Sequence, residues 1–144
     1  MRRLLIPVAL VLSAVLPASA PAAPSSPVHQ ADWASQANQI CVVWLAKAKK
    51  EFGSPVTPAQ LYTFAQKAKA LESQELGQLE KIPGRTAAGT AALAAVKVDI
   101  AEVGSAITAW NAGKPAQFVS ILKKYLNDGR PKSAFAVAGA TQCG

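Results

Sequence analysis

The fold is decided by residues 93–110, LAAVKVDIAEVGSAITAW. The large apolar residues of this stretch recur at alternating steps of three and four, which places them on one stripe of an α-helix. The stripe is typical of helices that pack almost antiparallel against their neighbours. Its members are Leu93, Val96, Ile100, Val103, Ile107 and Trp110. We predict a long bundle helix that opens near Thr86 and ends at Gly113 and Pro115.

A first helical segment lies closer to the amino terminus. Its apolar residues also share one helical stripe, and the sequence Gly53-Ser54-Pro55 ends it. Asp32 stands where a carboxylate can cap or charge the start of a helix. The stripe consists of Trp33, Ala37, Ile40, Cys41, Trp44, Ala48 and Phe52.

The second helical segment has the clearest start signal of the chain. Thr57 is a candidate N-cap, Pro58 suits the first helical position and Gln60 completes a capping box. The segment is predicted to end near Lys81, because Pro83 follows. Its apolar stripe consists of Leu61, Phe64, Ala68, Leu71, Leu76 and Leu79.

A fourth segment begins around Phe118 and is interrupted by Gly129-Arg130-Pro131. A proline inside a helix removes a hydrogen bond and clashes with the preceding turn, so a kink or break is expected there. Residues 133–138 can resume as a short helix. Sustained alternation of period two is absent from the sequence. We predict an all-α, antiparallel up-down four-helix bundle whose last helix is kinked or broken near Gly129–Pro131.

The amino-terminal residues have the order of a secretory signal peptide. Arg2 and Arg3 precede an apolar run over residues 4–16, and small residues follow over 18–23. We predict a signal peptide over residues 1–22, with cleavage after Ala20 and an uncleaved anchor as alternatives. A flexible leader over 23–31 and a helical-bundle domain over 32–144 would follow. The apolar run is too short for a transmembrane helix, so a secreted, extracytoplasmic protein is expected.

The chain contains two cysteines, Cys41 in the first helical segment and Cys143 near the carboxyl end. In an exported protein, such a pair is typical of one structural disulfide. The bridge would tie the first helix to the tail that follows the broken last helix. A metal-binding or reactive pair is the alternative, but the sequence has no C-x-x-C motif and no clustered histidines.

Composition and motifs provide little catalytic chemistry. The single histidine, His29, lies in the leader, so a Ser-His-acid triad inside the domain is excluded. No motif for a metal, haem or another cofactor is present, and none is expected. The formal net charge is +7, but the lysine clusters lack interleaved aromatic residues, so nucleic acid is not expected as a partner. The lysines are interpreted as a solvated surface, with an anionic envelope polymer or lipid as the alternative.

Two pairs of acids stand one helical turn apart. These pairs could bind a cation or act in acid-base chemistry, but we interpret them as a solvated face that pairs with Lys69 and Lys97. The pairs are Glu72 with Glu75, and Asp99 with Glu102.

The three tryptophans are the remaining candidates for a site. Trp33, Trp44 and Trp110 lie on the apolar stripes of the first and third helical segments. They can line a ligand pocket between helices, as a carrier would require. Core filling is the favoured interpretation, because all three follow the helical spacing.

Short motifs at both ends resemble a known group of proteins. The first helix contains ANQIC over residues 37–41, and the chain ends with GATQCG over 139–144. This arrangement resembles a broad group of small exported actinobacterial proteins with an A-N-x-I-C start and a G-x-x-x-C-G end. The resemblance implies a helical bundle locked by the cysteine pair, and it implies no activity or catalytic residue. Gly129-Arg130-Pro131 departs from the pattern, in which one helix would continue.

The sequence therefore favours a non-enzymatic exported protein, a monomer that acts by binding an unknown protein or as an envelope-associated component. One alternative is a carrier of a small apolar ligand between the helices. The other is an inhibitor of an exported enzyme, which rests on the architecture alone.

Overall fold

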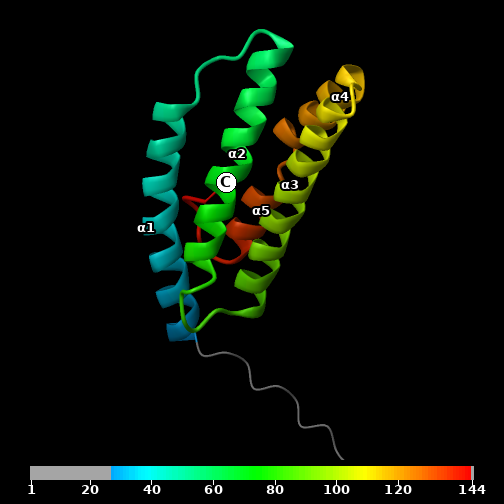
Figure 1. The fold of residues 1–144 in the computed structure, drawn as a ribbon. Coiled ribbons are helices and arrows are strands. Elements are labelled where there is room, and N and C mark those ends of the chain that lie inside the picture. The colour runs from blue at the N-terminus through cyan, green and yellow to red at the C-terminus, as the bar shows by residue number, and fades with distance from the viewer. Residues whose placement is uncertain (1–26, 144) are drawn as a thin grey trace, which may run out of the picture.

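The computed structural model describes residues 27–143, which form an antiparallel up-down bundle with a bent last helix (Figure 1). The predicted signal peptide, its cleavage site, residues 23–26 of the leader and Gly144 lie outside the described residues. The helices are α1 (Pro27–Glu51), α2 (Pro58–Leu79), α3 (Ala87–Asn111), α4 (Pro115–Leu126) and α5 (Arg130–Val137). The predicted all-α fold class is confirmed. Residues 27–31, which were expected in the leader, are the first residues of α1.

The predicted start signals of α2 and α3 act as helix caps. The backbone amide of Gln60 donates to Oγ1 of Thr57 at 3.2 Å, and its side-chain oxygen accepts from the Thr57 amide at 3.0 Å. Thr86 accepts from the Gly89 amide at 3.1 Å. The predicted cap at Asp32 is wrong, because α1 begins at Pro27 and the Asp32 carboxylate accepts instead from the Gln36 side chain at 3.2 Å.

The break in the last helix falls at the predicted place. Helix α4 ends at Leu126, and α5 begins at Arg130, directly before Pro131. Oδ1 of Asp128 accepts from the Arg130 amide at 3.0 Å, which satisfies a backbone donor at the start of α5. The bend lets α4 and α5 pack against successive parts of α3.

Helix α3 is the central element of the bundle. It packs against α2, α4 and α5, whereas α1 packs against α2 and lies apart from α4 (Figure 1). Two apolar clusters lie along α3. The first contains Trp33, Leu79, Leu93, Val96 and Phe135. The second contains Ala65, Val103, Ala106, Phe118 and Leu122.

The predicted disulfide joins Cys41 to Cys143, with Cα atoms 5.1 Å apart and a sequence separation of 102. Oδ1 of Asn38 accepts from the Gln142 amide at 2.8 Å, one turn before Cys41. Gly139 has a φ of +81°, a conformation that glycine adopts without strain, and it passes close to Ala34. The end motifs ANQIC and GATQCG therefore seat the tail on α1.

Candidate functional site

The acidic groove is the main candidate site, and Glu72 and Glu75 of α2 lie at its centre. It consists of two adjoining cavities, both of which these two residues line. The cavity on the side of α3, α4 and α5 has a volume of about 310 Å³, and the one on the side of α1 has about 180 Å³. The groove exists because α1 and α4 flank α2 without closing over it. Its apolar walls include Trp44, Leu45, Phe52, Val96, Leu126 and Phe135.

Glu72 connects α2 to α4 at the groove. The hydroxyl of Tyr125 in α4 donates a hydrogen bond to Oε1 of Glu72, and Oε2 is buried without a hydrogen-bond partner among the described residues. Burial raises the pKa of Glu72 to about 7, although the hydrogen bond from Tyr125 acts in the opposite direction. Burial also raises the pKa of Tyr125, so its hydroxyl stays protonated and remains a donor.

Glu75 lies one helical turn further along α2. Burial raises its pKa to about 7, and the neighbouring charge of Glu72 adds to the effect. Near neutral pH, both carboxyls are therefore poised between the neutral and the charged form. A cation between them would favour the charged form of both.

A second group of acids lies at the α4–α5 end of the groove. The carboxylates of Asp99, Glu102 and Asp128 have oxygens within 4.8 Å of one another. The guanidinium of Arg130 forms ion pairs with all three, at 3.0 Å from Glu102 and 3.7 Å from Asp99. Arg130 also lowers the pKa of Asp128 through a side-chain hydrogen bond. The three negative charges thus have an internal counter-ion.

Asp99 is the most enclosed of these acids. Its side chain is 9% exposed, and its Oδ1 has no hydrogen-bond partner among the described residues. Burial raises its pKa to about 6, and the Asp128 charge contributes further. Oδ1 of Asp99 lies 3.7 Å from the Arg130 guanidinium, too far for a hydrogen bond, so it is the kind of position that a donor from a ligand would satisfy.

The interpretation of these acids as a solvated face is wrong. Glu72, Glu75 and Asp99 face the groove, and Lys97 pairs instead with Glu80, at 2.7 Å. Helical periodicity describes one helix at a time. It does not show that α4 and α5 pack over the side of α2 and α3 that carries these acids. One signal was available: Asp99 lies three residues after Val96 and four before Val103, both of which are buried.

The structure separates the three tryptophans. Trp33 is fully buried and packs against Gly89 at the start of α3, whereas Trp110 lies at the other end of α3 and stacks on Tyr62. The 21 residues from Gly89 to Trp110 span about 30 Å, so Trp33 and Trp110 cannot share a pocket. Trp44 lines the acidic groove, where Lys47 lies 4.5 Å from its ring centroid.

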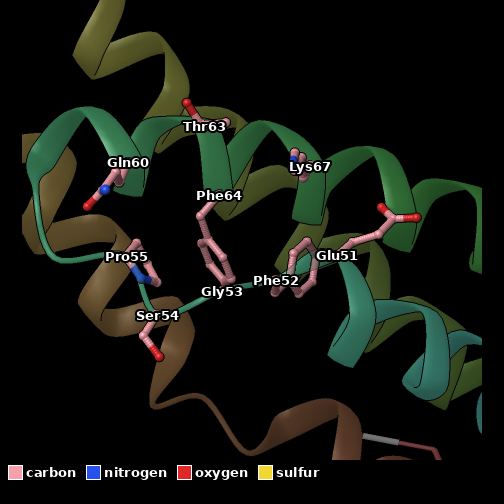
Figure 2. Close-up of a pocket in the computed structure, with 9 residues that line it drawn as sticks. All are labelled: Glu51, Phe52, Gly53, Ser54, Pro55, Gln60, Thr63, Phe64 and Lys67. Atoms are coloured by element: carbon pink, nitrogen blue, oxygen red, sulfur yellow. The ribbon is translucent and has the colours of Figure 1, made fainter.

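A further cavity, of about 240 Å³, lies at the turn between α1 and α2 (Figure 2). The rings of Phe52 and Phe64 pack edge to face there, with centroids 5.0 Å apart. The side-chain oxygen of Gln60 is already used by the α2 cap, and the charged residues Glu51 and Lys67 are exposed. This cavity therefore offers apolar surface without the buried charges of the acidic groove.

Sequence reasoning missed Tyr125 and Arg130 as residues of the site. Tyr125 was not among the predicted candidate residues, and Arg130 was named only as part of the helix break. Their roles depend on the bend between α4 and α5, which brings both to the acids of α2 and α3.

Comparison of the chain with models of protein families, with curated proteins and with solved structures finds no match. Within residues 27–143, every helix is too short or too polar to cross a membrane. The fold and site thus define a disulfide-closed helical bundle with an acidic groove.

Proposed function

We propose that this protein is a non-enzymatic exported binding protein whose acidic groove captures an organic cation, an amine or ammonium group with an apolar body. The observation that carries the proposal is the pair of cavities that share Glu72 and Glu75. Negative charge at the centre and apolar walls on both sides form a site for a ligand of opposite charge with apolar arms.

The charge distribution supports a cationic ligand. The chain has eight acidic residues and a formal net charge of +7, yet five of the acids lie in or beside the groove. Only Arg130 and Lys124 form ion pairs with these five among the described residues, and both contact Glu102. Glu72 and Glu75 form no ion pair among the described residues, and Lys132, which also lines the groove, is exposed and pairs with neither. A positive ligand group would therefore supply the missing counter-charge.

The walls of the groove support an apolar body on the ligand. Trp44 and Phe52 lie on the α1 side, and Val96 and Phe135 lie on the opposite side. Burying a chain of methylene groups there would gain about 0.8 kcal/mol for each group. A small inorganic cation would leave these walls exposed to water, so an amphiphilic organic cation fits better.

Binding rather than catalysis is proposed because of the residues that surround the carboxyls. Among the described residues that line the two cavities, there is no serine, threonine, cysteine or histidine to act as a nucleophile, and the amine of Lys132 is exposed to solvent. The raised pKa of Tyr125 also makes its phenolate unavailable near neutral pH. The extracytoplasmic location rests on the predicted signal peptide, with support from the disulfide.

Isothermal titration calorimetry with three ligands of equal chain length tests the proposal. We expect octylammonium to bind at pH 7.5 at least about tenfold more tightly than octanol or octanoate. The variant Glu72→Gln/Glu75→Gln should lose this preference, whereas Glu51→Gln/Glu80→Gln, which removes two exposed acids, should keep it. Equal binding of octanol and octylammonium, or equal loss in both variants, would contradict the proposal.

A further inference from the structure

A lysine-lined depression lies on another face of α3. This lysine trough has a volume of about 650 Å³ and is open to solvent. Lys69 of α2, Lys97 of α3 and Lys114 at the start of α4 line it. Its floor is formed by small residues of α3 and the turn that follows: Ala101, Gly104, Ser105 and Ala112.

The three lysines are spread along the trough. The ammonium group of Lys69 lies over Gly104, where a Cβ would approach it to 3.3 Å. Seven residues separate Lys97 from Gly104 and another seven lead to the end of α3, so the lysines are spread over about 20 Å of the helix. Lys97 pairs with Glu80 but remains 60% exposed. Lys69 and Lys114 form no ion pair among the described residues.

The trough and the acidic groove lie on different faces of α3. Lys97 and Asp99 are two residues apart, which places them about 200° apart around the helix axis. A ligand in one site therefore leaves the other accessible. The opposite charges of the two sites also call for chemically different partners.

We infer that the lysine trough docks an extended polymer that carries repeated phosphate groups, such as a polyol phosphate chain of a cell envelope. Three lysines spread over about 20 Å of the helix match several groups along one chain better than a single ion. Lysine is a point-charge ligand for phosphate and needs no fixed geometry. A membrane surface fits less well, because the trough is hollow and its two large apolar residues, Ile100 and Ile121, are half-buried rather than exposed. This inference is independent of the proposed function of the acidic groove.

Docking through the lysine trough would also determine where the protein acts. A protein held on an envelope polymer through the trough would keep its acidic groove open to small ligands. Such attachment would be reversible and weakened by salt, because each lysine that contacts a phosphate releases counter-ions from it.

Binding of fluorescently labelled inorganic polyphosphate, measured by anisotropy at low salt, tests the inference. The variant Lys69→Gln/Lys97→Gln/Lys114→Gln should bind at least about tenfold more weakly than the wild type. The control Lys49→Gln/Lys50→Gln/Lys123→Gln removes the same charge from exposed positions on α1 and α4. It should lose no more than about threefold.

Two results would overturn the inference. One is an equal loss in both triple variants, which would show that polyphosphate senses only the net charge. The other is binding to phosphatidylglycerol vesicles without binding to polyphosphate, which would make the partner a membrane. Circular dichroism melting of each variant checks that the fold is retained, as expected for exposed lysines.

Discussion

The hydroxyl of Tyr125 in α4 donates a hydrogen bond to Oε1 of Glu72 in α2, across 53 residues of sequence. This contact links the bent last helix to the central acids of the groove. Tyr125 also contributes to the wall on one side of Glu72, whose other side faces α1. The bond therefore connects the stability of the α4 region with the charge state of the candidate site.

Removing this bond should destabilise the protein. Tyr125→Phe leaves the carboxyl of Glu72 part-buried with neither oxygen paired, and we expect a loss of about 1–3 kcal/mol in the free energy of unfolding. Urea denaturation measures it. Tyr62→Phe is the matched control, because Tyr62 donates to Asn111 in an exposed position at 2.9 Å. A loss in Tyr62→Phe as large as that in Tyr125→Phe would contradict the role given to burial.

Stability should fall as the pH rises from about 5 to 7.5. Glu72 and Glu75 have a pKa of about 7 in the folded protein against 4.5 without these surroundings, so the folded state binds more protons in this window. Because both side chains are only half-buried, solvent screens the effect, and we expect a loss of about 1–2 kcal/mol, equivalent to roughly 4–10 °C in melting temperature. Glu102 and Asp128 have lowered pKa values, so their contribution to stability is lost as the pH falls below about 4.5.

Two double variants test whether Glu72 and Glu75 cause this pH dependence. Glu72→Gln/Glu75→Gln should remove most of the slope between pH 5 and 7.5, and Asp99, whose pKa is raised to about 6, should account for the rest. Glu51→Gln/Glu80→Gln should leave the profile as in the wild type. Thermal melting across the pH range is the measurement. A wild-type melting temperature that rises steadily from pH 5 to 7.5 would show that burial does not raise the pKa values of these carboxyls.

Cys41→Ser and Cys143→Ser should lower the melting temperature about equally. Each opens the same loop of 102 residues, and chain entropy assigns such a closure about 4–5 kcal/mol. The loss should appear first in the tail, which Asn38 and the bridge together hold on α1. Calorimetry of the two variants and of the reduced wild type measures it. Unchanged melting after complete reduction would refute the structural role.

Two helical glycines should respond in opposite ways to alanine. Gly77 has no neighbour within 4 Å of an added Cβ, so Gly77→Ala should stabilise α2 by about 0.5–1 kcal/mol. At Gly89, an added Cβ would lie 3.2 Å from the buried ring of Trp33, so Gly89→Ala should destabilise the protein by about 1–3 kcal/mol. Denaturant unfolding measures both. Stabilisation by both substitutions would mean that Trp33 has room to move.

The local signals of the sequence predicted the helices well because the determinants are local. Thr57, Gln60 and Thr86 act within one turn, and Pro131 breaks the helix wherever its neighbours lie. The acidic groove was not predictable in this way. Whether Asp99 faces water depends on where α5 lies after the bend, and that follows from packing between residues distant in sequence.

The same limit applies to the tryptophans. Helical spacing placed Trp33 and Trp110 on apolar stripes, and both pack in the interior or against aromatic neighbours. Spacing did not reveal that about 30 Å of α3 separates them. Spacing also did not show that Trp44 alone of the three lines the acidic groove. Its indole N–H donates there to Gln78 at 3.1 Å.

Nuclear magnetic resonance titration with octylammonium tests directly whether the acidic groove binds an organic cation. Each tryptophan gives its own indole N–H signal, so Trp33, Trp44 and Trp110 report on three separate parts of the bundle. We predict that Trp44 and the backbone amides around Glu72, Glu75 and Tyr125 shift in a saturable way, while the Trp33 and Trp110 signals stay in place. Shifts centred on Trp110, or no saturable shift at Trp44, would contradict the assignment of the acidic groove as the binding site.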